Sequence, residues 1–236
     1  MKKLIAVAVT ISTFGFISAA SAADLPTKGP VYTTSPYNWT GLYLGVNGGY
    51  GWGDTSGGFW STEFVGDNYG ISGGLFGGQV GYNYQSAGTP LVLGIEADWD
   101  WADVDGSRTF IGQGPINTSA KLENLGTVRG RIGYAWDRAL FYGTAGWAWS
   151  RLKADCGNFC SSPIQSHTVD GYTLGAGLEY GITPNLSLKA EYLYVHLTPT
   201  DFFTNLSPNP CTGSCGIGAN VNIVRLGLNW RFSSTP

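Results

Sequence analysis

Six charged side chains are the residues of this sequence whose types and spacing could do joint chemistry. Each stands in a run where every second residue is apolar, on the parity opposite to the apolar residues. They are Glu96, Arg129, Arg131, Glu179, Glu191 and Arg225. Because successive side chains of a β-strand point to opposite faces, the alternation predicts that these charges share one polar face. If that face is enclosed, the charges must pair, which makes either a structural plug of ion pairs or a gated pore.

Four cysteines form a second set with chemical potential, as two close pairs. Cys156 lies near Cys160, and Cys211 lies near Cys215. An even number of cysteines in an exported chain favours disulfides, so we expect two local bridges. A four-cysteine metal site is the alternative, but no histidine lies between the members of either pair, and we expect no metal.

The two histidines, His167 and His196, have no nucleophile motif beside them. We therefore expect no catalysis and no cofactor. A haem role is the alternative interpretation, with these histidines or nearby tyrosines as iron ligands. Two histidines scattered along the chain do not by themselves define such a site.

The composition indicates what kind of element must position these residues. The chain has 236 residues, and only 12% are charged, against roughly 25% in soluble domains. It holds 36 glycines and 14% aromatic residues, while its mean hydropathy is −0.02. A helical membrane protein would be far more apolar. A β-barrel in a membrane needs an apolar residue only at every second position. The net charge of −3, without a basic stripe, argues against a nucleic-acid partner.

The beginning of the sequence is typical of a secretion signal. Basic residues at Lys2 and Lys3 precede an apolar stretch over 4–17, and Ala20-Ser21-Ala22 is a small-residue cleavage pattern. An uncleaved membrane anchor is the alternative. We expect a signal peptide at 1–22, a periplasmic segment at 23–38, a barrel at 39–232 and a tail at 233–236.

Eight segments with a period of two are predicted to be strands. They cover 39–52, 71–85, 90–102, 122–136, 139–153, 170–182, 186–197 and 219–232. The facing of the fifth segment stays open, because both of its sides are apolar or small. Long connections near 53–70, 103–121, 154–169 and 198–218 alternate with short ones. This alternation predicts an all-β, eight-stranded antiparallel transmembrane barrel with long extracellular loops and short periplasmic turns.

A soluble β-sandwich or lipocalin-like barrel is the alternative fold. Such folds carry their charges outside, whereas here the polar faces hold few charges of mixed sign. The apolar faces end in aromatic residues such as Trp101, Trp136 and Trp230. Aromatic residues gather at membrane interfaces, which favours the membrane barrel.

Four short runs resemble a known family. They are Ala23–Pro26, Trp39–Gly45, Arg129–Tyr134 and Val224–Phe232. Their order resembles the small outer-membrane proteins of alphaproteobacteria, described as porin family, outer membrane immunogenic or hemin-binding proteins. The resemblance covers essentially the whole mature chain. It implies a barrel like that of outer-membrane protein A, a place in the outer membrane and exposure at the cell surface.

The same resemblance implies insertion by the barrel-assembly machinery, which recognises a terminal aromatic residue, here Phe232. The residues at 233–236 that follow it depart from the family pattern.

The expected function is a structural, surface-exposed barrel with a lumen plugged by charges. Its expected partners are outer-membrane lipid, the barrel-assembly machinery, and host or surface ligands at the loops. A narrow porin for ions or small solutes, or haem or adhesin-type binding by the loops, is the alternative.

Overall fold

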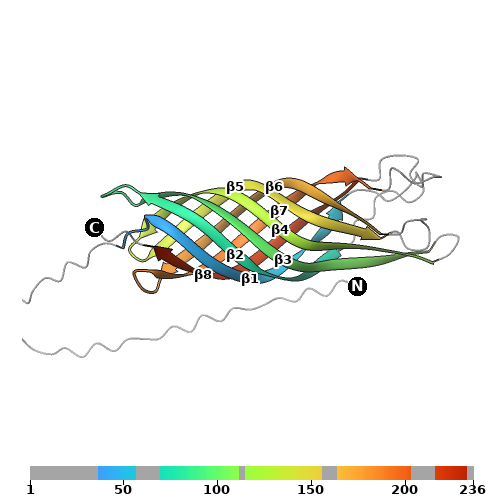
Figure 1. Ribbon diagram of the computed structural model, residues 1–236, viewed down its shortest axis with the longest axis horizontal. Helices are drawn as coiled ribbons and strands as arrows, with labels where there is room; N and C mark the ends of the chain where they lie inside the picture. The colour runs from blue at the N-terminus through green and yellow to red at the C-terminus, as the bar shows by residue number, and fades with distance from the viewer. Residues whose placement is uncertain (1–36, 57–69, 112–114, 156–163, 203–215, 233–236) are drawn as a thin grey trace, which may run out of the picture. The chain divides into compact units, whose positions relative to one another are not determined.

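The structure is a computed structural model that describes residues 37–56, 70–111, 115–155, 164–202 and 216–232. Eight β-strands follow one another, and each pairs antiparallel with the next (Figure 1). The strands are β1 (Gly41–Ser56), β2 (Gly70–Gln85), β3 (Leu91–Ile111), β4 (Pro115–Trp136), β5 (Ala139–Asp155), β6 (Ile164–Gly181), β7 (Leu186–Asp201) and β8 (Gly216–Phe232). The predicted eight-stranded antiparallel barrel is confirmed.

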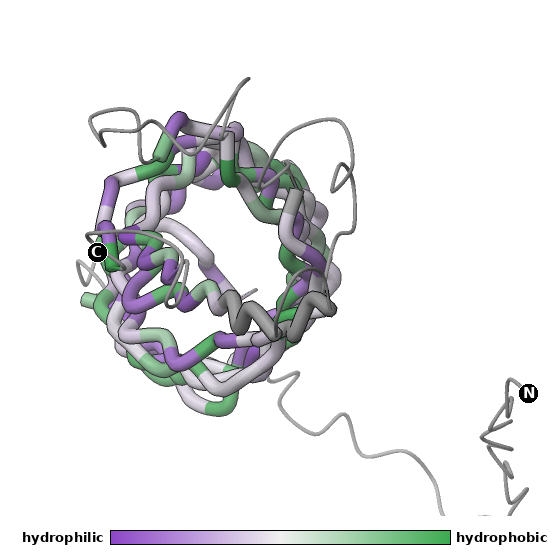
Figure 2. The backbone as a smooth tube through the Cα atoms, turned by 90° about the vertical axis from the view of Figure 1, so that its right-hand side faces the viewer, coloured by the Kyte–Doolittle hydropathy of each residue, from purple (hydrophilic) through white to green (hydrophobic). Residues whose placement is uncertain are grey.

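The sheet closes because β1 also pairs with β8, from Leu42 opposite Phe232 to Ser56 opposite Gly218. Figure 2 looks along the barrel and shows the closed ring of strands. Closure pairs the backbone groups that an open sheet would leave exposed at its edges, as a lipid environment requires. We call the end at which β1 begins and β8 finishes the terminal end, and the opposite end the loop end.

No helix within the described residues is long and apolar enough to cross a membrane.

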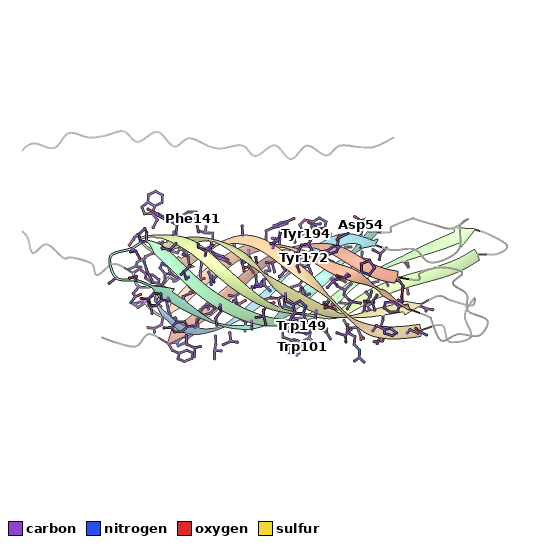
Figure 3. The ribbon with its side chains drawn as sticks, turned by 90° about the horizontal axis from the view of Figure 1, so that it is seen from above. Asp54, Trp101, Phe141, Trp149, Tyr172 and Tyr194 are labelled. Carbon is purple, nitrogen blue, oxygen red and sulfur yellow. The ribbon has the colours of Figure 1, made fainter. Side chains whose placement is uncertain are left out.

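An apolar belt covers the outer wall of the barrel, beginning at the terminal end. Outward residues of β8 such as Leu226 and Leu228 are 58% and 44% exposed, although they are hydrophobic. Aromatic side chains border this belt at both levels. Figure 3 shows Trp101, Trp149, Tyr172 and Tyr194 at the level nearer the loop end and Phe141 towards the terminal end. Such paired aromatic borders mark the two interfaces of a membrane.

The facing of polar and apolar residues reverses beyond the aromatic border at the loop end. In β5, Trp147 points outward, whereas further along the strand Arg151 points outward and Leu152 and Ala154 are buried inside. Exposed ion pairs lie on this part of the outer wall, Lys121–Asp103 at 2.5 Å and Lys153–Glu123 at 2.6 Å. This outer wall therefore has the character of a surface in water.

The strands are longer at the loop end than the sequence predicts. Most of the predicted loop 103–121 belongs to β3 and β4, and β6 begins at Ile164 rather than near residue 170. The prediction was wrong there because it followed the apolar residues of one parity. Beyond the aromatic border the apolar residues occupy the inward positions, so the alternation continues in the opposite phase. In β4 a bulge between Leu122 and Leu125 also shifts the register.

Glycines on the inner wall make room for large side chains in the lumen. A Cβ atom at Gly81 would overlap the Tyr43 hydroxyl, and one at Gly177 would overlap the Tyr142 hydroxyl. A larger residue at either position would displace a tyrosine. The high glycine content of the sequence thus serves a lumen that is filled by side chains. The same packing settles the facing of β5, because Tyr142 is buried inside and Phe141 is exposed outside.

Candidate functional site: the charged lumen

Arg129 of β4 is the centre of a layer of paired charges inside the barrel. Its Nη2 atom lies 2.5 Å from Glu96 and 2.7 Å from Asp98, both on β3. Its Nη1 atom donates to Glu191 of β7 across the lumen at 3.1 Å. One guanidinium thus holds carboxylates from two sides of the barrel, with the geometry that charge-assisted hydrogen bonds prefer.

Arg225 of β8 makes a second bridge through the same carboxylates. Its Nε atom donates to Glu191 at 2.8 Å, and its Nη1 atom donates to Asp100 at 2.9 Å and to Asp98 at 3.2 Å. Asp98 and Glu191 therefore each accept from both Arg129 and Arg225. The two arginines and the carboxylates between them form one connected network.

Arg131 extends the network towards the terminal end. Its Nη2 atom donates to Glu179 of β6 at 2.9 Å, and its Nη1 atom donates to the Tyr43 hydroxyl at 3.0 Å. The guanidinium carbon lies 3.9 Å from the centre of the Tyr142 ring, a cation–π contact. The Tyr43 hydroxyl in turn donates to Glu96 at 2.7 Å. Tyr43 thereby connects Arg131 to Glu96, one of the carboxylates around Arg129.

All six charged residues predicted to share a face lie in this layer, which we call the charged layer. Three further members, Asp98, Asp100 and Lys189, are not among the six charges named from the sequence. The Lys189 ammonium lies 3.0 Å from the Glu96 carboxylate, and the residue is fully buried. The signal for all three was present in the sequence, because Asp98 and Asp100 share the parity of Glu96, and Lys189 shares the parity of Glu191.

The charged layer is buried and nearly balanced in charge. Its carboxylates are Glu96, Asp98, Asp100, Glu179 and Glu191, and its cations are Arg129, Arg131, Lys189 and Arg225. Each of these residues is at most 5% exposed. Removing one partner from such a set leaves an uncompensated charge in a place where water cannot easily solvate it. The arrangement can therefore hold the walls of the barrel together and block the lumen.

Residues just before β1 close the lumen at the terminal end. Trp39 is fully buried and packs with Val92, Leu140 and Tyr142. Arg231 of β8 stacks over the rings of Tyr37 and Trp39, at 4.6 and 4.9 Å from their centres. We call Tyr37, Trp39 and Arg231 the terminal cap. Tyr37 was expected in a periplasmic segment outside the barrel, whereas its ring lies against barrel residues.

Apolar side chains fill the lumen at the loop end. The inward residues Ile217, Ala219, Val221 and Ile223 of β8 are each at most 3% exposed. They pack with inward residues of the other strands, including Leu152, Leu193 and Leu197. We call this cluster the loop-end core. The sequence interpretation missed it, since it treated these residues as parts of loops or left their facing unstated.

The remaining predicted site residues have different outcomes. Phe232 ends β8, pairs with Leu42 and is half exposed on the outer wall. Cys156, Cys160, Cys211 and Cys215 lie outside the described residues, so their pairing stays a prediction. In the described part of the chain, no cluster of three or more histidine, cysteine or acidic residues is arranged to hold a metal ion.

The histidines lie apart from each other. On the outer wall, the Nδ1 atom of His196 lies 2.6 Å from the Oδ1 atom of Asn220. The ring of His167 packs against the ring of Phe202, with 4.7 Å between the ring centres. The sequence Gly70–Gly74 matches the Gly-x-Ser-x-Gly pattern of serine hydrolases, but it runs straight through β2. A nucleophile of that class sits on a sharp turn between a strand and a helix, so the match has no catalytic geometry.

Comparison with known proteins gives the wider context of this barrel. The chain is 37% identical to the 31 kDa outer-membrane immunogenic protein of Brucella melitensis, over 92% of this chain and 95% of the relative. It is 34% identical to the 22 kDa outer membrane protein of Rhizobium leguminosarum, over 83% and 79% of the two chains.

Two solved structures are similar to the chain at a low level. Neisserial surface protein A has 14% identity and a TM-score of 0.43, with 82% of this chain and 98% of that chain covered. The attachment invasion locus protein Ail of Yersinia pestis has 14% identity and a TM-score of 0.39, with 81% and 99% covered.

The family described as outer membrane protein beta-barrel domain matches residues 10–232, which include all eight strands. The full-length relatives are outer-membrane proteins of Gram-negative bacteria, and the chain has the closed barrel that this location requires. The chain belongs to the outer membrane protein β-barrel domain family.

Proposed function

We propose that the protein is a closed outer-membrane anchor that presents its loop end to the outside of the cell and does not conduct ions. The observation that carries the proposal is the filling of the lumen. The terminal cap, the charged layer and the loop-end core follow one another along the barrel axis. An eight-stranded barrel has an interior that side chains can fill, and here they do so with three kinds of chemistry.

The extension of the strands beyond the aromatic border supports the outward presentation of the loop end. Its wall carries charged and amide side chains, with ion pairs whose side chains are exposed. In this topology the terminal end and the segment before β1 face the periplasm. The names of the relatives state no enzymatic activity, and structural presentation requires none.

Further proposed features concern export, assembly and the loops. Residues 1–22 are removed as a signal peptide. Phe232 is the terminal aromatic residue that the barrel-assembly machinery recognises. Cys156–Cys160 and Cys211–Cys215 form local disulfides in different loops, which contact host or surface ligands. Peptide mapping without reduction tests the bridges, and a Cys156–Cys211 linkage or four free thiols would contradict them. Mass spectrometry of the mature protein locates the cleavage site.

Single-channel recording in planar bilayers tests the closed state. The wild-type barrel is expected to conduct poorly. Arg129→Ala should raise the conductance, because it removes the central cation, frees several carboxylates and leaves room for water. Arg151→Ala is the matched control, since it removes an exposed arginine from the outer wall and should leave the current unchanged.

The narrow-porin alternative predicts a different record. It requires a steady wild-type current with clear ion selectivity, and a change of selectivity rather than of current size in Arg129→Ala. That outcome would replace the closed anchor with a porin.

A further inference from the structure

A groove interrupts the apolar belt on the outer wall near the terminal end. It extends from the start of β3 across β4, β5 and β6 and has a volume of about 520 Å³. Its floor includes Gly143 and Ala176, which are paired neighbours on β5 and β6. Its sides are raised by four large outward side chains, Leu91, Ile132, Tyr134 and Phe141. Figure 3 shows Phe141 projecting away from the wall of the barrel.

The position of the groove places it within one leaflet of the membrane. Gly143 occupies an outward-facing position of β5, five residues after Arg138 in the turn. A strand rises ~3.4 Å per residue and is tilted by about 40°, which puts Gly143 ~13 Å from the level of the turn. Half of a hydrocarbon core is ~15 Å thick, so the groove spans the depth of the acyl chains nearest the terminal end.

A cation lies in the turn that joins β4 to β5, the hairpin that contributes most of the groove lining. Arg138 lies in the exposed turn between β4 and β5, two residues after Trp136 and three before Phe141. Its place next to the aromatic border is the level of lipid headgroups. An arginine there complements the charge of a phosphodiester and can hold it by two parallel hydrogen bonds.

The chemistry of the lining indicates what fills the groove. Its named side chains are all apolar apart from the hydroxyl of Tyr134, so it offers little for polar recognition of a protein partner. The lipid leaflet surrounds this wall, and a groove one or two side chains deep suits a single acyl chain. We propose that the groove binds one acyl chain of a phospholipid of the terminal-end leaflet, with the phosphate of that lipid held by Arg138. In the topology proposed above, this is the periplasmic leaflet.

Native mass spectrometry of the barrel released from vesicles of phosphatidylethanolamine and phosphatidylglycerol tests the site. The wild-type protein should retain one phospholipid under conditions that strip other lipids. Gly143→Leu fills the groove, and a Cβ at this position would meet only one backbone atom, at 3.9 Å. This variant should lose the retained lipid several-fold. Arg138→Gln should weaken retention while leaving the groove open.

Matched controls separate the site from general effects on lipid contact. Gly48→Leu also places a leucine on the outer wall, where a Cβ would have no contact shorter than 3.7 Å, and it should retain lipid like the wild type. Arg151→Gln removes a cation near the loop end and should do the same. Equal retention in Gly143→Leu and wild type, or equal loss in Gly143→Leu and Gly48→Leu, would overturn the proposal.

A dimer that Gly143→Leu abolishes would also overturn it, because a second copy of the chain would then occupy the groove. The phospholipid site stands or falls separately from the closed anchor, since it lies on the outer wall and conductance depends on the lumen.

Discussion

Strand β8 passes through two regions of the barrel that use the same alternation in opposite senses. Near its end, Leu226 faces outward and Arg225 faces inward, whereas nearer its start, Asn220 faces outward and Val221 faces inward. The inward parity does not change along the strand; only the chemistry does. The two adjacent apolar residues Ile223 and Val224 mark the point of exchange.

The difference follows from the solvent outside the wall. Where lipid covers the barrel, outward residues must be apolar, and the lumen can hold the paired charges of the charged layer. Where water covers the barrel, outward residues can be polar, and the inward residues form an apolar core as in a soluble protein. Alternation therefore indicates a strand, whereas the identity of its apolar face indicates the medium around that strand.

The largest expected effect comes from the charged layer. Arg129→Ala leaves Glu96, Asp98 and Glu191 without their central partner and should lower the free energy of unfolding by about 3–5 kcal/mol. Equilibrium unfolding by urea in lipid vesicles measures it. Arg151→Ala, on the water-facing wall, should change stability by no more than ~0.5 kcal/mol. Similar losses in the two variants would remove the distinction between the regions.

The loop-end core should respond to lost volume rather than to lost charge. Leu152 is fully buried there, and Leu152→Ala should cost about 2–5 kcal/mol by opening a cavity. The neighbouring Lys153→Ala, which removes a partly exposed ion pair with Glu123, should cost ~0–1 kcal/mol. The same unfolding titration compares them, and a larger cost at Lys153 would contradict an apolar interior at this level.

The outer wall offers a third comparison, between two positions on one face of β8. Leu226→Arg should cost about 2–4 kcal/mol if the residue lies near the middle of the bilayer. Asn222→Arg, on the same face but at the aromatic border, where Asn222 lies opposite Trp52 and Tyr194, should cost only ~0–1 kcal/mol. Vesicles of matched thickness keep the two measurements comparable. Equal penalties would place both residues in the same medium.

The smallest expected effect is at an ion pair that is as short as those in the lumen. Lys121 lies 2.5 Å from Asp103, and Arg129 lies 2.5 Å from Glu96. The hydrogen bond to Asp103 raises the pKa of the exposed Lys121. Its ammonium is nonetheless solvated with or without a partner, so Lys121→Ala should unfold like the wild type. A clear loss of stability would show that this wall is shielded from water.

Several features of the fold could be predicted from the sequence because they depend on local alternation. Val224, Leu226 and Leu228 define an outward face, and closure then places Arg225 inside. Eight such segments predict the barrel that the structure has. The same parity predicts that six charges of the charged layer share the inner face. The same alternation places Asp98, Asp100 and Lys189 on the polar faces, although the sequence prediction did not name them among the paired charges.

Other features could not be predicted because they depend on the medium or on contacts far apart in the chain. The reversed phase of Leu152 and Ala154 looks like the end of a strand until the level of the membrane is known. The contact of Tyr37 and Trp39 with Arg231 joins residues from opposite ends of the chain. The groove over Gly143 and Ala176 depends on which side chains of neighbouring strands lie in register.

The reversal along β8 can be measured directly by the accessibility of spin labels. Single cysteines replace Asn220, Asn222, Val224 and Leu226 in turn, in a variant without the native cysteines, and each label is exposed to oxygen and to a water-soluble nickel chelate. All four positions face outward, so the account predicts collisions with the chelate at 220 and 222 and with oxygen at 224 and 226. Preferential collision with oxygen at all four positions would contradict it, because the loop end would then lie in lipid rather than in water.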